Sequence, residues 1–103
     1  MNEVPNEKAT NRVPDLAERP RAREDVVLRQ ADEEWVLFDP VNKKVHVLNV
    51  TSGLVWTLMD GENSLQSMVA MVSESFDPPP SPSQVEQDLL EITSTFIAAG
   101  LLL

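Results

Sequence analysis

Few residues of this chain are of the types that carry out catalysis or bind metals. It contains a single histidine, His46, and no cysteine, so the usual zinc ligand sets and a thiol nucleophile are missing. None of its serines stands in a G-x-S-x-G elbow, and no glycine-rich phosphate loop is present. The carboxylate pair Glu33-Glu34 falls in an expected turn, where solvation is the simpler interpretation. We therefore expect a protein that is not an enzyme and needs no cofactor, with His46 as an ordinary strand residue.

The charge of the chain disfavours nucleic acid as a partner. The 103 residues carry a formal net charge of −9. In residues 26–103 the only basic side chains are Arg29, Lys43 and Lys44. Binding to a phosphate backbone depends on Lys and Arg, which this part of the chain largely lacks. No apolar run reaches the roughly 18 residues of a membrane span, and the N-terminus lacks the apolar core of a signal peptide. We expect a cytoplasmic protein that binds neither nucleic acid nor membrane.

The first half of the folded part predicts a small antiparallel sheet. Residues 1–22 are rich in Pro and charged side chains and poor in large apolar ones, so we expect a disordered tail there and one folded domain over residues 23–103. Three short β-prone runs follow, at Val26–Leu28, Trp35–Phe38 and Val45–Val50. Turn residues separate the runs, which favours a three-stranded meander.

The second half predicts three helices. Thr51 or Ser52 is expected to cap the first, which carries Trp56 on its buried face. Ser64 is expected to cap the second. Ser81, followed by Pro82 and by Gln84 at the third helical position, is expected to cap the third in a capping box. Asp60-Gly61, Asp77-Pro78 and Gly100 are the corresponding stop signals. The predicted fold class is therefore α+β, a three-stranded antiparallel sheet followed by three helices.

Two features are candidates for a binding site. The segment of the third strand, Asn42–Leu48, contains no proline, so its edge could pair with a strand from another chain, although a helix of the same chain could equally cover it. In the last helix Leu90 and Ile97 lie off the buried stripe, and either widen the core or leave an apolar flank for a partner. Trp35 either packs in the core, which we favour, or offers an exposed aromatic anchor.

The residues from the third run onward resemble the PqqD-like family. Val45-His46-Val47-Leu48-Asn49, then Thr51-Ser52-Gly53, Trp56 and Leu58-Met59-Asp60-Gly61 are similar to the family's "LN-x-T-(A/G)…W-x-L-L-D-G" signature. Ser64–Phe76 is similar to the helix that follows in the family. Val85, Asp88-Leu89, Ile92, Phe96 and Gly100-Leu101-Leu102 resemble its closing segment. The resemblance covers residues 26–103. Thr93 departs from the family, because a larger apolar residue is usual there.

The resemblance implies a winged helix-turn-helix that serves as a recognition element for ribosomally synthesised and modified peptides. Such a domain binds the leader of a precursor peptide as an extra strand beside the third strand and against the last helix. It delivers the peptide to a modifying enzyme, in the case of PqqD itself a radical S-adenosylmethionine enzyme. The residues carried over are Lys43, Lys44, Val45, His46, Val47 and Leu48 for backbone pairing, and Gln84, Asp88, Leu90, Thr93 and Ile97 on the last helix.

Two other classes of function stay open from the sequence. A winged-helix transcription regulator would share the fold, but Glu86, Asp88 and Glu91 on the last helix would repel phosphates. A structural docking domain would use the same free strand and apolar flank. The chain is expected to be a monomer or a weak homodimer.

Overall fold

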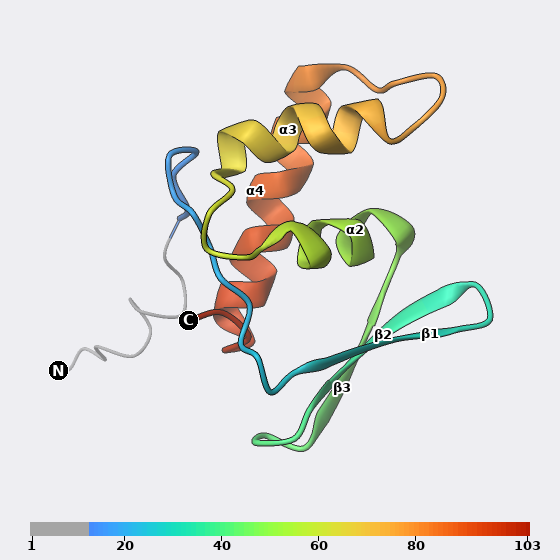
Figure 1. Ribbon diagram of the computed structural model, residues 1–103, viewed down its shortest axis with the longest axis vertical. Helices are drawn as coiled ribbons and strands as arrows, with labels where there is room; N and C mark the ends of the chain where they lie inside the picture. The colour runs from blue at the N-terminus through green and yellow to red at the C-terminus, as the bar shows by residue number, and fades with distance from the viewer. Residues whose placement is uncertain (1–12) are drawn as a thin grey trace, which may run out of the picture.

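The β-prone runs form the three strands of one sheet. The computed structural model describes residues 13–103 (Figure 1). The strands are β1 (Val27–Ala31), β2 (Glu34–Asp39) and β3 (Lys44–Leu48), and they lie in the order β1-β2-β3 with antiparallel pairing. Asp32 and Lys43 adopt positive φ at the two hairpin turns, a conformation that tight turns between antiparallel strands require.

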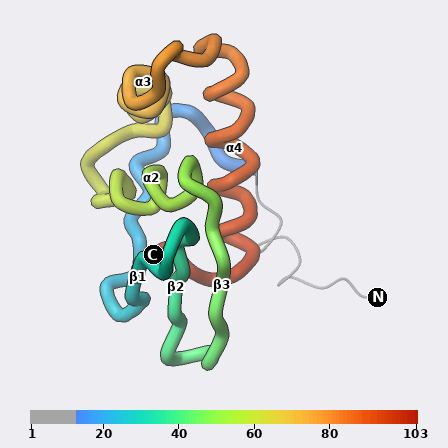
Figure 2. Tube along the Cα trace, turned by 90° about the vertical axis from the view of Figure 1, so that its right-hand side faces the viewer, coloured from blue at the N-terminus to red at the C-terminus, as the bar shows by residue number. Residues whose placement is uncertain are grey.

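Three helices follow the sheet: α2 (Val50–Leu58), α3 (Leu65–Glu74) and α4 (Pro82–Ala98). The expected α+β order of three strands and then three helices is therefore confirmed, while the winged helix-turn-helix description stays a prediction. In Figures 1 and 2, α4 runs along one side of the molecule, and α2 and α3 lie across it. No helix among residues 13–103 is long and apolar enough to cross a membrane.

Side-chain caps fix where the helices begin. Ser64 accepts a hydrogen bond from the Ser67 amide, and Ser81 accepts one from the Gln84 amide, so both expected caps are confirmed. The expected cap of α2 was wrong: Asn49 caps it by accepting from the Ser52 amide at 2.8 Å. Because β3 ends at Leu48, the chain turns into the helix at once, earlier than Thr51 or Ser52 would allow. The side chain of Gln84 does not return to Ser81 and instead donates to Asp88.

The core lies between the inner face of the sheet and the helices. Leu37 of β2 is fully buried and belongs to one core cluster with side chains from all three helices. Trp56 packs edge-to-face on Phe96 of α4, with ring centroids 5.3 Å apart, which confirms Trp56 as a core residue. Trp35 is only half-buried, so the expectation that it belongs to the core holds for one side of its ring.

Part of the expected tail contacts the helices. Residues 1–12 lie outside the described residues. Residues 13–22 run beside α2 and α3, where Leu16 and Glu18 accept hydrogen bonds from the amides of Gln66 and Leu65 at the start of α3. Ala22 donates to Met59, and Arg21 accepts from Leu103. The bonds from Leu65 and Gln66 satisfy amides that the first turn of α3 leaves unpaired, a contribution that the composition of the segment did not indicate.

A buried ion pair joins the start of the folded chain to the sheet and to the end of α4. The guanidinium of Arg23 contacts the carboxylate of Asp39 at 3.0 Å, and it also donates to the Gly100 carbonyl at 2.9 Å. Asp39 is fully buried, and it accepts further hydrogen bonds from the amides of Val41 and Asn42. A buried charge is tolerated when it is paired and hydrogen-bonded in this way.

We predict that Asp39→Asn destabilises the fold and removes part of its acid sensitivity. Arg23, followed by Asn42, holds the pKa of the Asp39 carboxyl well below its usual range. The stability that this carboxylate contributes is therefore present above its unfolded-state pKa of about 4 and is lost as the pH falls below it. At pH 7 the variant should unfold roughly 5–10 °C below the parent, and thermal unfolding followed by circular dichroism would measure this.

The difference between parent and variant should shrink as the pH falls below about 4. Asp25→Asn is the matched control, because Asp25 also pairs with Arg23 but is exposed. This variant should lower the unfolding temperature less than Asp39→Asn does. A pH-independent gap between Asp39→Asn and the parent would contradict the role assigned to this carboxylate.

Candidate functional site

The strand β3 forms a free edge of the sheet. Within residues 13–103 it pairs only with β2, so one side of its backbone has no strand partner. Such an edge presents N–H and C=O groups that an incoming strand can complete. Val45 and Val47 point to the outer face of the sheet and are 60% and 62% exposed. His46 points to the inner face, opposite Leu37 of β2, and is half-buried.

A hollow of about 400 Å³ lies between this edge and the C-terminal end of α4. We call it the β3–α4 hollow; its lining residues are Asn42, Lys44, His46, Ala98, Ala99 and Gly100. In Figure 2 the upper part of β3 lies beside the lower, C-terminal part of α4. The helix contributes only two methyl groups and a glycine here, so its end does not fill the space beside β3.

Helical spacing puts two of the predicted helical residues on the same side of α4 as the β3–α4 hollow, although neither lines it. Asp88 lies 11 positions before Ala99, which is about three full turns of 3.6 residues, so the two residues share one side of α4. Gln84, one turn before Asp88, donates to its carboxylate at 2.9 Å. Because the rise is about 1.5 Å per residue, Asp88 stands roughly 15 Å up the helix from Ala98. That length corresponds to about five residues of extended strand.

The other three predicted helical residues are not brought to β3. Leu90 lies nine positions before Ala99, about two and a half turns, so it points away from the β3–α4 hollow and packs partly against the core. Ile97, two positions before Ala99, also faces away. Thr93 is 1% exposed and is part of the interior. A role for these three residues in binding stays a prediction that the helix geometry does not favour.

Three lining residues were not predicted from the sequence: Ala98, Ala99 and Gly100. The run Ala-Ala-Gly at the end of a helix was the available signal, because small side chains permit a hollow where the helix faces a strand edge. Gly100 adopts φ 72° and ends α4, and its carbonyl is held by Arg23. The position of the helix end, and hence one wall of the hollow, depends on this glycine.

One polar atom in the hollow has no partner within the described residues. The Nε2 atom of His46 is buried and makes no hydrogen bond, and the same holds for the hydroxyl of Thr93 in the core. Buried polar atoms are usually hydrogen-bonded, and His46 lines an open hollow, so a bound group could supply the missing bond. The described residues include no cluster of three or more His, Cys, Asp or Glu side chains that could hold a metal ion. The arrangement is therefore suited to binding an extended chain through its backbone.

Comparison with protein families and curated sequences gives one match. The family model described as coenzyme PQQ synthesis protein D (PqqD) matches residues 34–102. That range spans β2 to the end of the chain, about two thirds of its length. No curated protein sequence matches significantly.

Three solved structures have a similar fold. One, titled "TbiB1 in complex with the TbiA(beta) leader peptide", is 20% identical with a TM-score of 0.67, and the match covers 80% of this chain and 93% of that one. A lasso peptide synthetase B1 complexed with the leader peptide is 19% identical with a TM-score of 0.69, over 82% and 98% of the chains. The PqqD truncation of PqqCD from Methylobacterium extorquens, described as a stand-alone recognition element, is 23% identical with a TM-score of 0.68, over 82% and 87%.

We predict that Gly100→Ala costs about 1 kcal/mol of stability. A Cβ at this position would meet nothing within 4 Å, so the cost comes from the positive φ alone, which L-residues with a Cβ adopt unfavourably. Urea unfolding of parent and variant would measure it. Gly100→Asn should recover part of the loss, because Asn tolerates this conformation better. Equal losses for Ala and Asn would contradict a purely backbone origin.

Proposed function

The chain belongs to the PqqD family, and we propose that it binds the leader of a ribosomally synthesised precursor peptide by strand addition to β3. The observation that carries the proposal is the unpaired edge of β3 beside the β3–α4 hollow. Two structures of similar fold were solved with a leader peptide bound, which supports the same class of ligand here. A binding role without catalysis fits this family.

In the proposed complex the peptide pairs with the backbone of residues 44–48, next to the turn at Lys43. Backbone hydrogen bonds of this kind supply affinity, and alternate side chains supply specificity. Side chains on one face of the added strand would lie beside Val45 and Val47. Those on the other face would enter the β3–α4 hollow, beside His46 and Lys44, and would pass Asp88 further along.

The second proposed partner is the enzyme that modifies the peptide, with a radical S-adenosylmethionine enzyme as the first candidate. We propose that the domain acts in the cytoplasm, as a monomer or a weak homodimer. A transcription regulator is disfavoured by the charge of α4. The helix carries Glu86, Asp88 and Glu91 and no Lys or Arg, so its surface would repel the phosphates of DNA.

Titration of the ¹⁵N-labelled chain with leader segments encoded beside its gene would test the proposal. We expect the backbone amides of residues 44–48 to shift and to become protected from hydrogen exchange, because the added strand satisfies their free edge. The amides of α3 should respond little, since that helix lies away from β3. If no leader perturbs β3 at millimolar concentration, strand addition at this edge is wrong.

Ala98→Leu is predicted to weaken leader binding at least tenfold without unfolding the domain. Ala98 is exposed and lines the β3–α4 hollow, so a larger side chain would occupy space that the peptide needs and would leave the core intact. Ala70→Leu is the matched control, because Ala70 is an exposed alanine on α3, remote from β3. Isothermal titration calorimetry would measure both affinities, and unchanged binding by Ala98→Leu would exclude the hollow from the site.

A further inference from the structure

We propose a second docking site, at which an apolar side chain on a basic segment of another protein inserts beside Trp35. The site is a hollow of about 230 Å³ between the start of β2, one side of α2 and the end of α3. We call it the Trp35 hollow. Its apolar walls come from Trp35, Val50, Leu54 and Phe76. The four belong to segments far apart in sequence that the fold brings together.

The aromatic wall of this hollow is held in place. A Cβ atom on Gly53 would stand 2.8 Å from Cγ of Trp35, so the indole lies directly on bare helix backbone. A ring seated in this way cannot swing over to fill the adjacent space without losing its contact with α2. Trp35 nevertheless stays half-buried, and the remaining ring surface faces the hollow. Aromatic side chains that are rigid and partly exposed are frequent energetic centres of protein interfaces.

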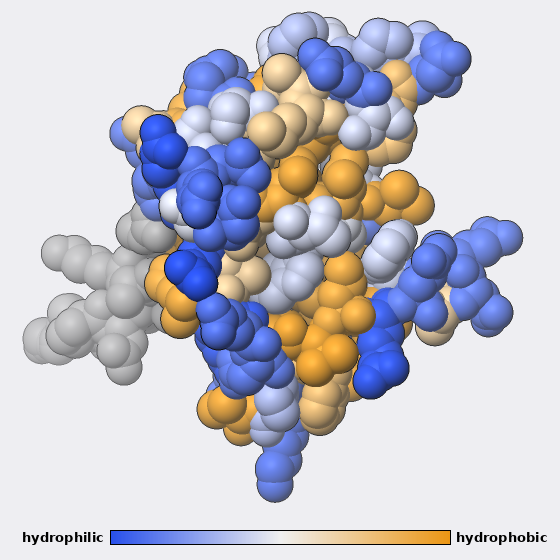
Figure 3. Space-filling model, in the orientation of Figure 1, coloured by the Kyte–Doolittle hydropathy of each residue, from blue (hydrophilic) through white to orange (hydrophobic). Residues whose placement is uncertain are grey.

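The charged residues nearest in sequence to the lining of the Trp35 hollow are all acidic. They are Glu33, Glu34, Glu74 and Asp77, each within two positions of a lining residue, and no Lys, Arg or His stands that close along the chain. All four acids are exposed, and none forms a salt bridge within the described residues. Figure 3 shows apolar surface over α2, with hydrophilic surface on the β1–β2 hairpin below it and on the α3–α4 loop above it. An apolar centre with an acidic rim complements a segment in which Lys or Arg flanks an apolar residue.

This site is separate from the one proposed for the leader. The Trp35 hollow and the β3–α4 hollow share no lining residue. The Trp35 hollow is lined by the start of β2, by α2 and by the end of α3. The β3–α4 hollow is lined by the first half of β3 and by the end of α4. Occupation of one hollow therefore does not require the residues that line the other. An adaptor that holds a peptide and also docks on an enzyme needs two such surfaces, so the inference goes one step beyond the proposed function.

A second protein fits the Trp35 hollow better than a second copy of the chain. Another copy would bring a further net charge of −9 to an already acidic rim, and like charges suppress association. A basic segment would gain both the charge contacts and burial of its apolar residue. The attraction should weaken with salt, because the rim charges are exposed.

Three synthetic peptides serve as probes for this site: acetyl-Lys-Lys-Leu-Lys-Lys-amide, the same peptide with Ser for Leu, and acetyl-Glu-Glu-Leu-Glu-Glu-amide. Each is titrated into the ¹⁵N-labelled full chain, with the two indole signals assigned through Trp35→Phe. We expect the Lys–Leu peptide to shift the Trp35 indole and the Gly53 amide but not the Trp56 indole, which reports from the core. The Ser peptide should bind at least threefold more weakly, and the Glu peptide should produce no shift.

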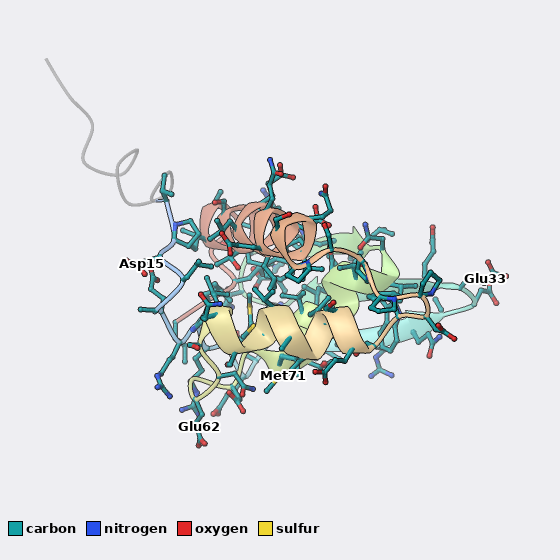
Figure 4. All side chains as sticks on the ribbon, turned by 90° about the horizontal axis from the view of Figure 1, so that it is seen from above. Asp15, Glu33, Glu62 and Met71 are labelled. Carbon is teal, nitrogen blue, oxygen red and sulfur yellow. The ribbon has the colours of Figure 1, made fainter. Side chains whose placement is uncertain are left out.

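Charge reversal supplies the matched control. Glu33→Lys should weaken binding of the Lys–Leu peptide at least threefold, whereas Glu62→Lys, with the same change of charge, should not. Figure 4 shows Glu33 at the tip of the β1–β2 hairpin and Glu62 on the far side of the molecule. Equal effects of the two variants, or equal binding of the Leu and Ser peptides, would overturn the proposal.

Two further results would also overturn it. One is a response of β3 amides to the Lys–Leu peptide in place of Trp35. The other is a concentration-dependent shift of the Trp35 indole without any peptide, with dimers in sedimentation, since a second copy would then occupy the hollow. A silent Trp35 together with leader-induced shifts in β3 would end this inference alone and would leave the proposed function standing.

Discussion

The buried ion pair between Arg23 and Asp39 is the contact on which the geometry of the proposed leader site depends. Asp39 ends β2 and accepts hydrogen bonds from the turn that leads into β3, so it sets where the free edge begins. Arg23 also holds the carbonyl of Gly100, which ends α4. One guanidinium therefore fixes both the strand and the helix end between which the β3–α4 hollow lies. Because Asp39 is fully buried, loss of Arg23 would leave its carboxylate without a compensating charge.

Local signals in the sequence predicted the elements well, because the physics that forms them is local. Ser64 and Ser81 cap α3 and α4 by accepting hydrogen bonds from amides three residues ahead. Pro82, the first residue of α4, also favours the start of that helix. The cap of α2 was misplaced because Asn49, Thr51 and Ser52 are all competent caps. The length of β3, which its pairing with β2 decides, selects among them. Arg23 lies 16 residues from Asp39 and 77 from Gly100, so no local pattern could indicate their contact.

The candidate site also has one part that local sequence signals predicted and one part that depends on tertiary packing. The edge of β3 could be predicted, since a three-stranded meander must leave its last strand unpaired unless another element covers it. Which side of α4 faces that edge is a tertiary property. The apolar character of Leu90 and Ile97 suggested the side of α4 that the helix spacing does not favour, because apolar residues at the margin of a helix stripe can equally extend the core. The side that does face β3 carries Ala98 and Ala99, whose small size makes space and leaves little trace in a hydrophobicity pattern.

The distribution of charge connects the two proposed surfaces more closely than the net charge does. Lys43 and Lys44, two of the three basic residues in residues 26–103, stand together where β3 begins, at the lower end of the leader site. The charged residues within two positions of the lining of the Trp35 hollow, near the other end of the sheet, are all acidic. This difference in local charge between the start of β3 and the Trp35 hollow would discourage a basic partner of the hollow from binding beside the two lysines. A small domain that must hold two ligands at once can use this separation in place of a larger interface.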